Sequence, residues 1–170
     1  MFDRQTISKT VEELARRISQ DYPEGNVVFV CILKGAVVFL SDLIRCLDIP
    51  VEIDFVRLAS YGSQQVSTRD VKITKDIELP IQGKDVLIIE DIVDTGWTLE
   101  YLVKKLSDRQ PKSIRVCALL NKEARREVEV QVDYVGFEVG NRFVVGYGID
   151  FNEKYRNLPE IYCVGEGPKK

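Results

Sequence analysis

Three carboxylates lie close together in one short stretch of the chain. The apolar run Val86–Ile89 ends at the adjacent acids Glu90 and Asp91, and Asp94 follows just before Thr95-Gly96 and a helical pattern. This order predicts a buried strand that ends in a phosphate-binding turn, because a helix N-terminus presents backbone N–H groups to an anion. Two adjacent acids at the end of a buried strand are costly unless they serve a cation or hydroxyl groups. The stretch therefore predicts a ligand with a phosphate and a diol or metal, such as a phosphorylated ribose.

Two further charged motifs follow apolar runs in the same way. Lys34-Gly35 comes directly after Val27–Leu33, where a lysine can meet an anion and a glycine permits close backbone approach. Lys122 ends another apolar run. Each motif also has a simpler explanation: a strand-to-helix turn at Lys34-Gly35, a solvated charge at Lys122, and a helix cap by Asp94 or Thr95 in the turn.

The elements that would position these residues alternate between strand and helix. Apolar periodicity predicts helices over Ser8–Gln20, with Ser8 as the cap, and over residues 36–47 and 99–106. It predicts strands over Val27–Leu33, Val51–Leu58, Val86–Ile89 and Ile114–Leu120, with further candidates at 134–137 and 143–147. Such alternation indicates an α/β fold with a mainly parallel sheet, in which ligands bind beyond the carboxyl ends of the strands. We therefore expect Lys34, Glu90, Asp94 and Lys122 at one edge.

The polar segment from Ser60 to Lys75 separates two predicted strands. Loops of this length are uncommon unless they act as lids or binding loops or are disordered. The sequence therefore predicts a lid over the ligand edge, with a plain exposed hairpin as the alternative.

Composition excludes several classes of protein. The 170 residues are 45% hydrophobic and 30% charged with a net charge of −3, which fits one globular domain and argues against nucleic-acid binding. No apolar run approaches the roughly 20 residues of a membrane helix, and no signal-peptide pattern is present, so we expect a cytoplasmic protein. The chain has no histidine, which rules out a histidine-based triad and histidine-ligated zinc. The four scattered cysteines are expected to be reduced core residues.

The motif E-D-I-V-D-T-G-W-T at residues 90–98 resembles the phosphoribosyl-pyrophosphate motif of the type I phosphoribosyltransferases. The acid at Asp94 is similar to that of their 6-oxopurine branch, the hypoxanthine-guanine phosphoribosyltransferases. Further matches, in the family's order and spacing, are C-I-L-K-G at 31–35, Ser60-Tyr61, Lys122 after a strand, and F-V-V-G-Y-G-I-D-F-N-E-K-Y-R at 143–156. The resemblance covers about residues 27–166.

The resemblance implies a fold and a reaction. The fold is a mainly parallel central sheet flanked by helices, with a small hood and a flexible flap at about residues 60–75, in one domain over residues 1–170. The reaction is transfer of the 5-phosphoribosyl group from phosphoribosyl pyrophosphate to N9 of hypoxanthine or guanine, which gives IMP or GMP and pyrophosphate in purine salvage. The implied cofactor is Mg²⁺, and the implied assembly is a homodimer or homotetramer.

The resemblance also implies roles for the matching residues. Asp94 would be the catalytic acid–base group at purine N7, and Glu90 and Asp91 would hold the ribose hydroxyls, directly or through Mg²⁺. The 5′-phosphate would lie against Asp94, Thr95, Gly96, Trp97 and Thr98. Pyrophosphate would meet Leu33, Lys34, Gly35 and Arg156, in a loop where the family often has a non-proline cis peptide. The purine would contact Lys122 at O6, the Phe143 ring, the Val144 backbone and Asp150, which could instead bind Mg²⁺. Ser60 and Tyr61 would close over the reaction.

Two features depart from the family pattern. Trp97 stands where a basic, polar or smaller apolar residue is expected, and residues 121–133 follow the pattern only loosely beyond Lys122. Three alternatives remain open. They are a transferase for another base such as xanthine or uracil, a regulator that senses phosphoribosyl pyrophosphate and binds nucleic acid, and a non-catalytic Rossmann-like module. No G-x-G-x-x-G turn supports the last.

Overall fold

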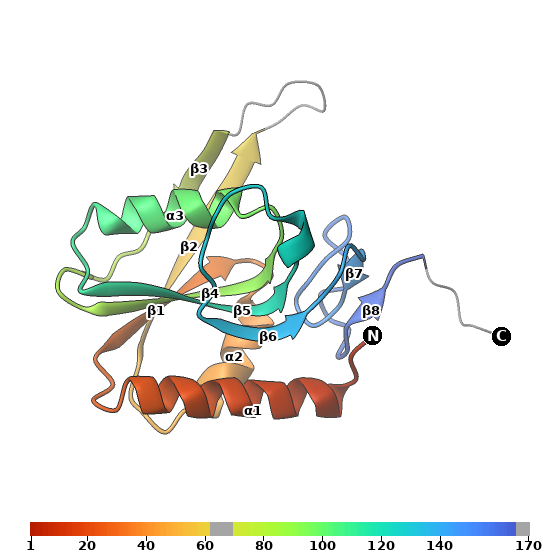
Figure 1. Cartoon of the computed structure of the whole chain (residues 1–170), viewed down its shortest axis with the longest axis horizontal. Helices are drawn as coiled ribbons and strands as arrows, with labels where there is room; N and C mark the ends of the chain where they lie inside the picture. The colour runs from red at the N-terminus through yellow and green to blue at the C-terminus, as the bar shows by residue number, and fades with distance from the viewer. Residues whose placement is uncertain (62–69, 166–170) are drawn as a thin grey trace.

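Six strands form the central sheet of the computed structural model, which describes residues 1–61 and 70–165 (Figure 1). They are β1 (Val27–Leu33), β2 (Glu52–Tyr61), β3 (Asp70–Lys75), β4 (Asp85–Val93), β5 (Ser113–Asn121) and β6 (Tyr134–Glu138). The order across the sheet is β3-β2-β1-β4-β5-β6. Only the edge pair β2–β3 is antiparallel, so the predicted mainly parallel sheet is confirmed.

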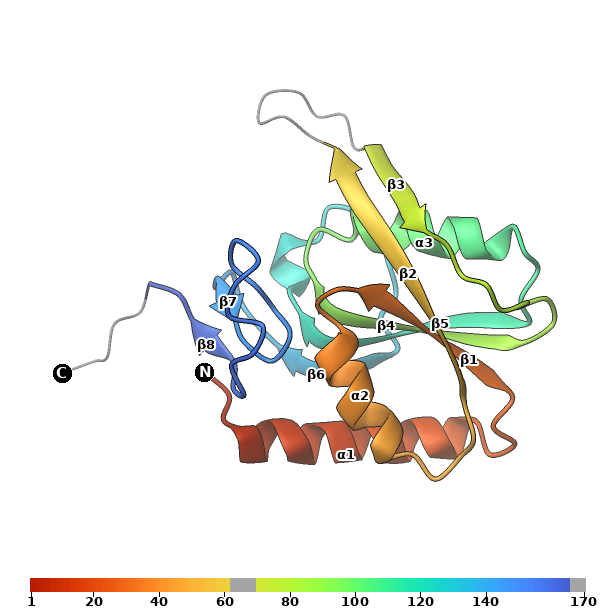
Figure 2. The same cartoon turned by 180° about the vertical axis from the view of Figure 1, so that it is seen from behind.

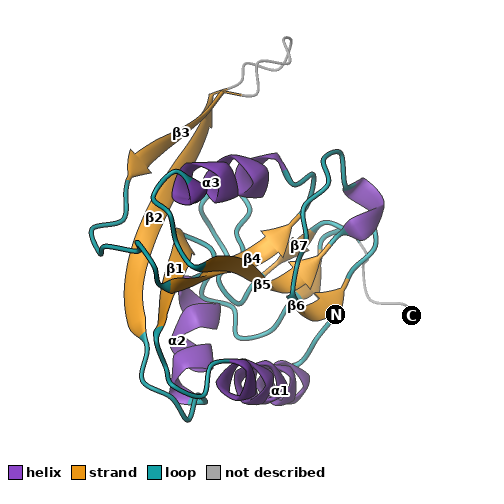
Figure 3. Ribbon diagram, turned by 60° about the vertical axis from the view of Figure 1, so that its left-hand side comes forward, coloured by secondary structure: helices purple, strands orange, loops and turns teal. Residues whose placement is uncertain are grey.

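Helices cover both faces of the sheet. Helices α1 (Arg4–Asp21) and α2 (Val37–Arg45) lie on one face, and α3 (Trp97–Ser107) lies on the other (Figures 1 and 3). Alternate strand residues serve the two faces: Phe29 and Leu87 belong to the core under α1 and α2, whereas Val30 and Ile88 belong to the core under α3. Burial on both faces explains why the strands have continuous apolar sequences rather than alternating ones.

The first helix begins earlier than the sequence predicted. It starts at Arg4, and the Asp3 side chain caps it by accepting a hydrogen bond of 2.8 Å from the Thr6 N–H. Ser8 lies inside the helix, where its hydroxyl donates to Glu12, so the predicted Ser8 cap is wrong. The predicted start at Ser8 is therefore four residues late. The first turn of the helix, before Ile7, has no buried apolar residue that could have marked it in the sequence.

A second, two-stranded sheet forms a small hood beside the carboxyl edge of the main sheet. Strand β7 (Val144–Val145) pairs antiparallel with β8 (Tyr162–Cys163), and Phe2 bridges to Ile161, which brings the N-terminus to the hood (Figure 2). The predicted strand over 143–147 is therefore only two residues long. It ends before Gly146, whose φ of +100° and close approach to the Glu160 carbonyl leave no room for a side chain.

The polar segment 60–75 is partly a strand. Residues 70–75 form β3 and pair with β2, so this part matches the hairpin alternative. Residues 62–69, on which much of the predicted lid falls, lie outside the described residues. The 3-10 helix η1 (Glu123–Arg125) and strands β3 and β8 were not predicted.

The four cysteines are free, but only two belong to the core. Cys31 and Cys117 are buried, whereas Cys46 is exposed at the end of α2 and Cys163 is partly exposed, so the core assignment is wrong for these two. No helix among residues 1–61 and 70–165 is long and apolar enough to cross a membrane.

Asp54 anchors the segment that leaves β3. Its side chain is 7% exposed and accepts hydrogen bonds from the backbone N–H groups of Phe55 (2.7 Å), Glu78 (2.6 Å) and Leu79 (2.8 Å). The Lys75 ammonium lies 3.6 Å away. Burial alone would raise the pKa of Asp54, but the backbone hydrogen bonds and the Lys75 charge outweigh it and lower the pKa below 3.8.

We expect Asp54→Ala to destabilise the protein by about 2–4 kcal/mol at neutral pH, because three backbone N–H groups lose their acceptor. A carboxyl with a depressed folded pKa stabilises the protein above the unfolded value and loses that contribution as the pH falls through the folded one. The difference between wild type and variant should therefore shrink below pH 3.8. Urea unfolding at neutral and acid pH measures it.

Glu52→Ala is the matched control on the same strand. Glu52 is 49% exposed and pairs only with Lys84 among the described residues, so its loss should cost less than about 1 kcal/mol. Equal destabilisation by the two variants would contradict the role of Asp54 as an anchor.

Candidate active site

The carboxyl ends of β1, β4, β5 and β6 meet at one edge of the sheet, since these strands are parallel neighbours. Lys34 follows β1, Glu90 lies near the end of β4 with Asp94 just beyond it, and Lys122 follows β5. Contacts between these loops bring the predicted residues into two groups at this edge. One group surrounds Asp94 and the other surrounds Lys34.

The acid pair at the end of β4 is packed against the loop after β1. Glu90 is 8% exposed, and the Asp91 N–H donates to its carboxylate at 3.2 Å. Burial raises the pKa of Glu90 well above its ordinary value, and the neighbouring Asp91 charge raises it further. A side chain on Gly35 would overlap the Asp91 carboxylate, so glycine is required where the two loops touch. The peptide bond between Leu33 and Lys34 is cis, as the family resemblance implies.

The turn after β4 presents backbone donors at the start of α3. Gly96 adopts a φ of +93° and caps the helix without a side-chain hydrogen bond, so the alternative of a cap by Asp94 or Thr95 is wrong. Between described residues, no hydrogen bond uses the N–H groups of Thr95, Gly96 or Thr98. A cavity of about 220 Å³ is lined by Glu90 and by four residues of the turn, which are Asp94, Thr95, Gly96 and Thr98. Free N–H groups at a helix N-terminus beside a cavity suit a phosphate group.

Asp94 lies between two cations. The Lys122 ammonium is 3.6 Å from its Oδ2, and the Arg125 Nε is 3.1 Å from its Oδ1. Oδ1 is buried and accepts no hydrogen bond from the described residues, although the Arg125 guanidinium lies close to it. The Lys122 side chain is only 6% exposed, so a solvated surface charge is the wrong explanation for this lysine. The sequence prediction missed Arg125, which lies in the loosely matching segment 121–133.

The second group of charges joins the loop after β1 to the hood. Lys34 donates to Glu153 at 2.8 Å, and Arg156 contacts Asp150 at 2.8 Å and Glu153 at 3.5 Å. The hydrogen bond from Lys34 lowers the pKa of Glu153. A side chain on Gly148 would overlap the Gly35 carbonyl, and Arg156 donates to the Gly148 carbonyl, so the hood is packed on this loop. Glu153 lies within the matching motif at residues 143–156, but no role was predicted for it.

The hood residues predicted to contact a planar ligand differ in exposure. Phe143 is 51% exposed and touches Phe151 edge to face, with ring centroids 5.5 Å apart. Val144 is buried in β7, and its side chain belongs to the core under α1 and α2. The backbone of Ser60 and Tyr61 ends strand β2, and the structure describes nothing further of these side chains.

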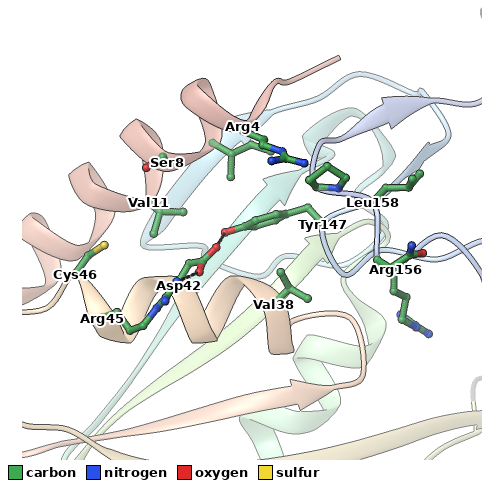
Figure 4. Close-up of a pocket in the computed structure, with 13 residues that line it drawn as sticks. Arg4, Ser8, Val11, Val38, Asp42, Arg45, Cys46, Tyr147, Arg156 and Leu158 are labelled. Atoms are coloured by element: carbon green, nitrogen blue, oxygen red, sulfur yellow. Dashed lines mark hydrogen bonds and ion pairs between the residues drawn. The ribbon is translucent and has the colours of Figure 1, made fainter.

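A larger cavity of about 650 Å³ lies between α1, α2 and the hood (Figure 4). Among the described residues, Arg156 is the only predicted site residue that lines it. Its guanidinium points away from the Tyr147–Asp42 hydrogen bond in the cavity wall. Volume alone does not make a site. The smaller cavity is the better candidate, since carboxylates and free backbone donors converge on it.

The acid pair suits a hard cation, because a cation beside Glu90 and Asp91 would relieve their mutual repulsion. Among the described residues, no three ligating side chains come together as a metal site. Asp150, the third predicted ligand, is instead paired with Arg156. Mg²⁺ commonly binds one or two carboxylates together with substrate phosphates and water, so two acids are sufficient.

The fold and this edge are those of an α/β protein whose strand ends could hold a phosphorylated ligand. The family model of the phosphoribosyl transferase domain matches residues 1–152. The chain therefore belongs to the phosphoribosyltransferase family.

Within that family the chain is similar to enzymes named for 6-oxopurines. The hypoxanthine phosphoribosyltransferase of Salmonella typhimurium is 46% identical over 163 residues, which cover 95% of this chain and 92% of that protein. A crystal structure of a hypoxanthine-guanine phosphoribosyltransferase from Bacillus anthracis matches with a TM-score of 0.92 and 43% identity over 96% of each chain. The bifunctional protein TilS/HprT of Listeria monocytogenes is 47% identical over 91% of this chain, which spans only 24% of that relative.

Proposed function

We propose that this protein is a purine salvage enzyme. It would transfer the 5-phosphoribosyl group of phosphoribosyl pyrophosphate to N9 of hypoxanthine or guanine and release pyrophosphate. The relatives named above for hypoxanthine and guanine support the substrate class. Because the match spans only 24% of the Listeria relative, the proposal concerns only the reaction that this chain can support by itself.

One observation carries the proposal: the buried Lys122 ammonium lies 3.6 Å from the Asp94 carboxylate. Asp94 begins the turn of residues 94–98, called the phosphate turn from here on. In a 6-oxopurine the O6 and N7 atoms are adjacent, so Lys122 could donate to O6 while Asp94 faces N7. Adenine carries an amino donor in place of O6, which an ammonium group would repel. The pair therefore supports a 6-oxopurine rather than a 6-aminopurine as the acceptor base.

The other residues of the edge would hold the phosphoribosyl donor. The N–H groups of Thr95, Gly96 and Thr98, with Asp94 and Trp97 in the same turn, would bind the 5′-phosphate at the N-terminus of α3. Lys34 and Arg156 would face the pyrophosphate next to Leu33 and Gly35. Glu90 and Asp91, with Asp150 as a further candidate, would hold Mg²⁺ or the ribose diol. Mg²⁺, when bound, would supply positive charge to the leaving pyrophosphate.

The reaction would then proceed by one exchange of bonds at C1 of the ribose. The bond from C1 to the pyrophosphate oxygen breaks with its electron pair on pyrophosphate, and purine N9 forms the new bond. The Asp94 carboxylate accepts the proton from N7 and thereby makes the base a better nucleophile. Lys34 and Arg156 stabilise the negative charge that develops on the leaving group. Phe143 would stack on the base, and the Val144 backbone would read its edge.

The proposal extends to the rest of the chain. Residues 1–170 would form one phosphoribosyltransferase domain, and the flap at about residues 60–75, including Ser60 and Tyr61, would close over the site and exclude water. We also propose a cytoplasmic homodimer or homotetramer. Light scattering after size-exclusion chromatography tests the assembly.

The activity test offers hypoxanthine, guanine, xanthine and adenine in parallel to the purified protein with phosphoribosyl pyrophosphate and Mg²⁺. We expect nucleotide formation with the first two bases and none with adenine, and the rate with xanthine would define the remaining specificity. Chelation of Mg²⁺ should stop turnover. Binding of the phosphoribosyl donor without turnover of any base would contradict the enzyme and support the regulator alternative.

A further inference from the structure

Residues 122–130, here called the bracing segment, run alongside the turn after β4. The Lys122 N–H donates to the Val93 carbonyl at 2.9 Å. The N–H groups of Glu127 and Val128 both donate to the Thr95 carbonyl, at 3.0 and 3.3 Å. The segment that begins with the proposed base-reading lysine therefore continues directly onto the proposed phosphate turn.

Gly96 fits closely beneath this segment. A Cβ added to Gly96 would lie 2.9 Å from the side chains of both Val128 and Val130 and 3.1 Å from that of Arg126. The bracing segment thus covers the turn at its tightest point, and movement of one would displace the other.

A side-chain hydrogen bond closes the contact at the start of α3. The indole Nε1 of Trp97 donates to Glu127 Oε2 at 2.9 Å. Trp97 and the segment 121–133 are the two places where the sequence departs from the family pattern, and the structure places them in contact. The unusual residue Trp97 is therefore hydrogen-bonded to a residue of the unusual segment, Glu127.

We propose that Trp97 and Glu127 are positioning residues that hold the phosphate turn against the bracing segment. Their hydrogen bond fixes the distance between the phosphate subsite and the base subsite of Asp94 and Lys122. This inference rests on the proposed function, because it assigns the turn to the 5′-phosphate of the donor. It predicts that loss of the bond weakens donor binding more than it slows the chemical step or weakens base binding.

The test compares Glu127→Ala, Glu127→Gln and Trp97→Phe with wild type. Glu127→Ala and Trp97→Phe should each raise the KM for phosphoribosyl pyrophosphate about three- to tenfold with a smaller change in kcat, and the double variant should be no worse than either single one. Glu127→Gln keeps an acceptor oxygen and should restore most of the affinity. Glu129→Ala is the matched control, since Glu129 is exposed on the same segment and makes no hydrogen bond or ion pair to residues 94–98 within the described chain.

The chain has a single tryptophan, so intrinsic fluorescence reports this contact directly. Glu127→Ala should change Trp97 emission without ligand, and titration with the donor should need a higher concentration than in wild type, whereas Glu129→Ala should match wild type. If wild type turns over but Glu127→Ala and Trp97→Phe keep its KM for the donor, the positioning role is overturned and the proposed function stands. If wild type neither binds the donor nor turns over, the proposed function fails, and the inference fails with it.

Discussion

Asp94→Asn should lower turnover by about 10²–10⁴-fold while leaving the affinity for phosphoribosyl pyrophosphate within about threefold of wild type. Asparagine has nearly the same shape as aspartate but cannot accept the proton from purine N7. The phosphate turn should keep its form, because its shape depends on the positive φ of Gly96 and on the bonds from Glu127 and Val128 to Thr95 rather than on the Asp94 charge.

Steady-state kinetics with hypoxanthine and calorimetric titration with the donor separate the two effects. Asp108→Asn is a suitable control, since Asp108 is exposed at the other end of α3 and should leave both quantities unchanged. Equal loss of turnover and donor binding would show that Asp94 holds the donor and would remove it from the role of general base.

The sheet could be predicted from the sequence because strands that are buried on both faces have continuous apolar sequences. Runs such as Val27–Leu33 are apolar at every position, and a run this short and rich in β-branched residues is typical of a strand covered by helices on both sides. The edge strand β3 has no such apolar run, since Asp70–Lys75 alternates polar and apolar residues and pairs on one side only. The ends of the elements were predicted less accurately. Helix α1 begins at Arg4 and not at Ser8, because its start is set by one local hydrogen bond to the Asp3 side chain.

The candidate site was predictable where motif and strand end coincide. Glu90, Asp94 and Lys122 directly follow or end apolar runs, so a parallel sheet brings them to one edge. Arg125, Glu127 and Glu153 were missed because their importance lies in contacts between loops: Arg125 with Asp94, Glu127 with Trp97, and Glu153 with Lys34. Apolar periodicity carries no information on such contacts.

The separation of Lys122 from solvent makes its substitution the sharpest test of base selection. Its side chain is 6% exposed and approaches Asp94 at 3.6 Å, so the ammonium has a fixed place from which to meet an incoming base. In Lys122→Ala, the ratio of kcat/KM for hypoxanthine to kcat/KM for adenine should fall by about 10²-fold or more. The variant lacks the ammonium group that would donate a hydrogen bond to O6 of hypoxanthine and repel the amino group of adenine.

Donor affinity should change much less than base selectivity in Lys122→Ala, since the phosphate turn and the cations Lys34 and Arg156 remain. Lys122→Arg is the matched variant, because it keeps a cationic donor near Asp94 and should retain most of the discrimination. Parallel kinetics with the two bases and titration with phosphoribosyl pyrophosphate measure both quantities. If discrimination against adenine is unchanged while donor affinity falls, Lys122 acts on the phosphate side through Asp94, and the 6-oxopurine preference must come from the hood.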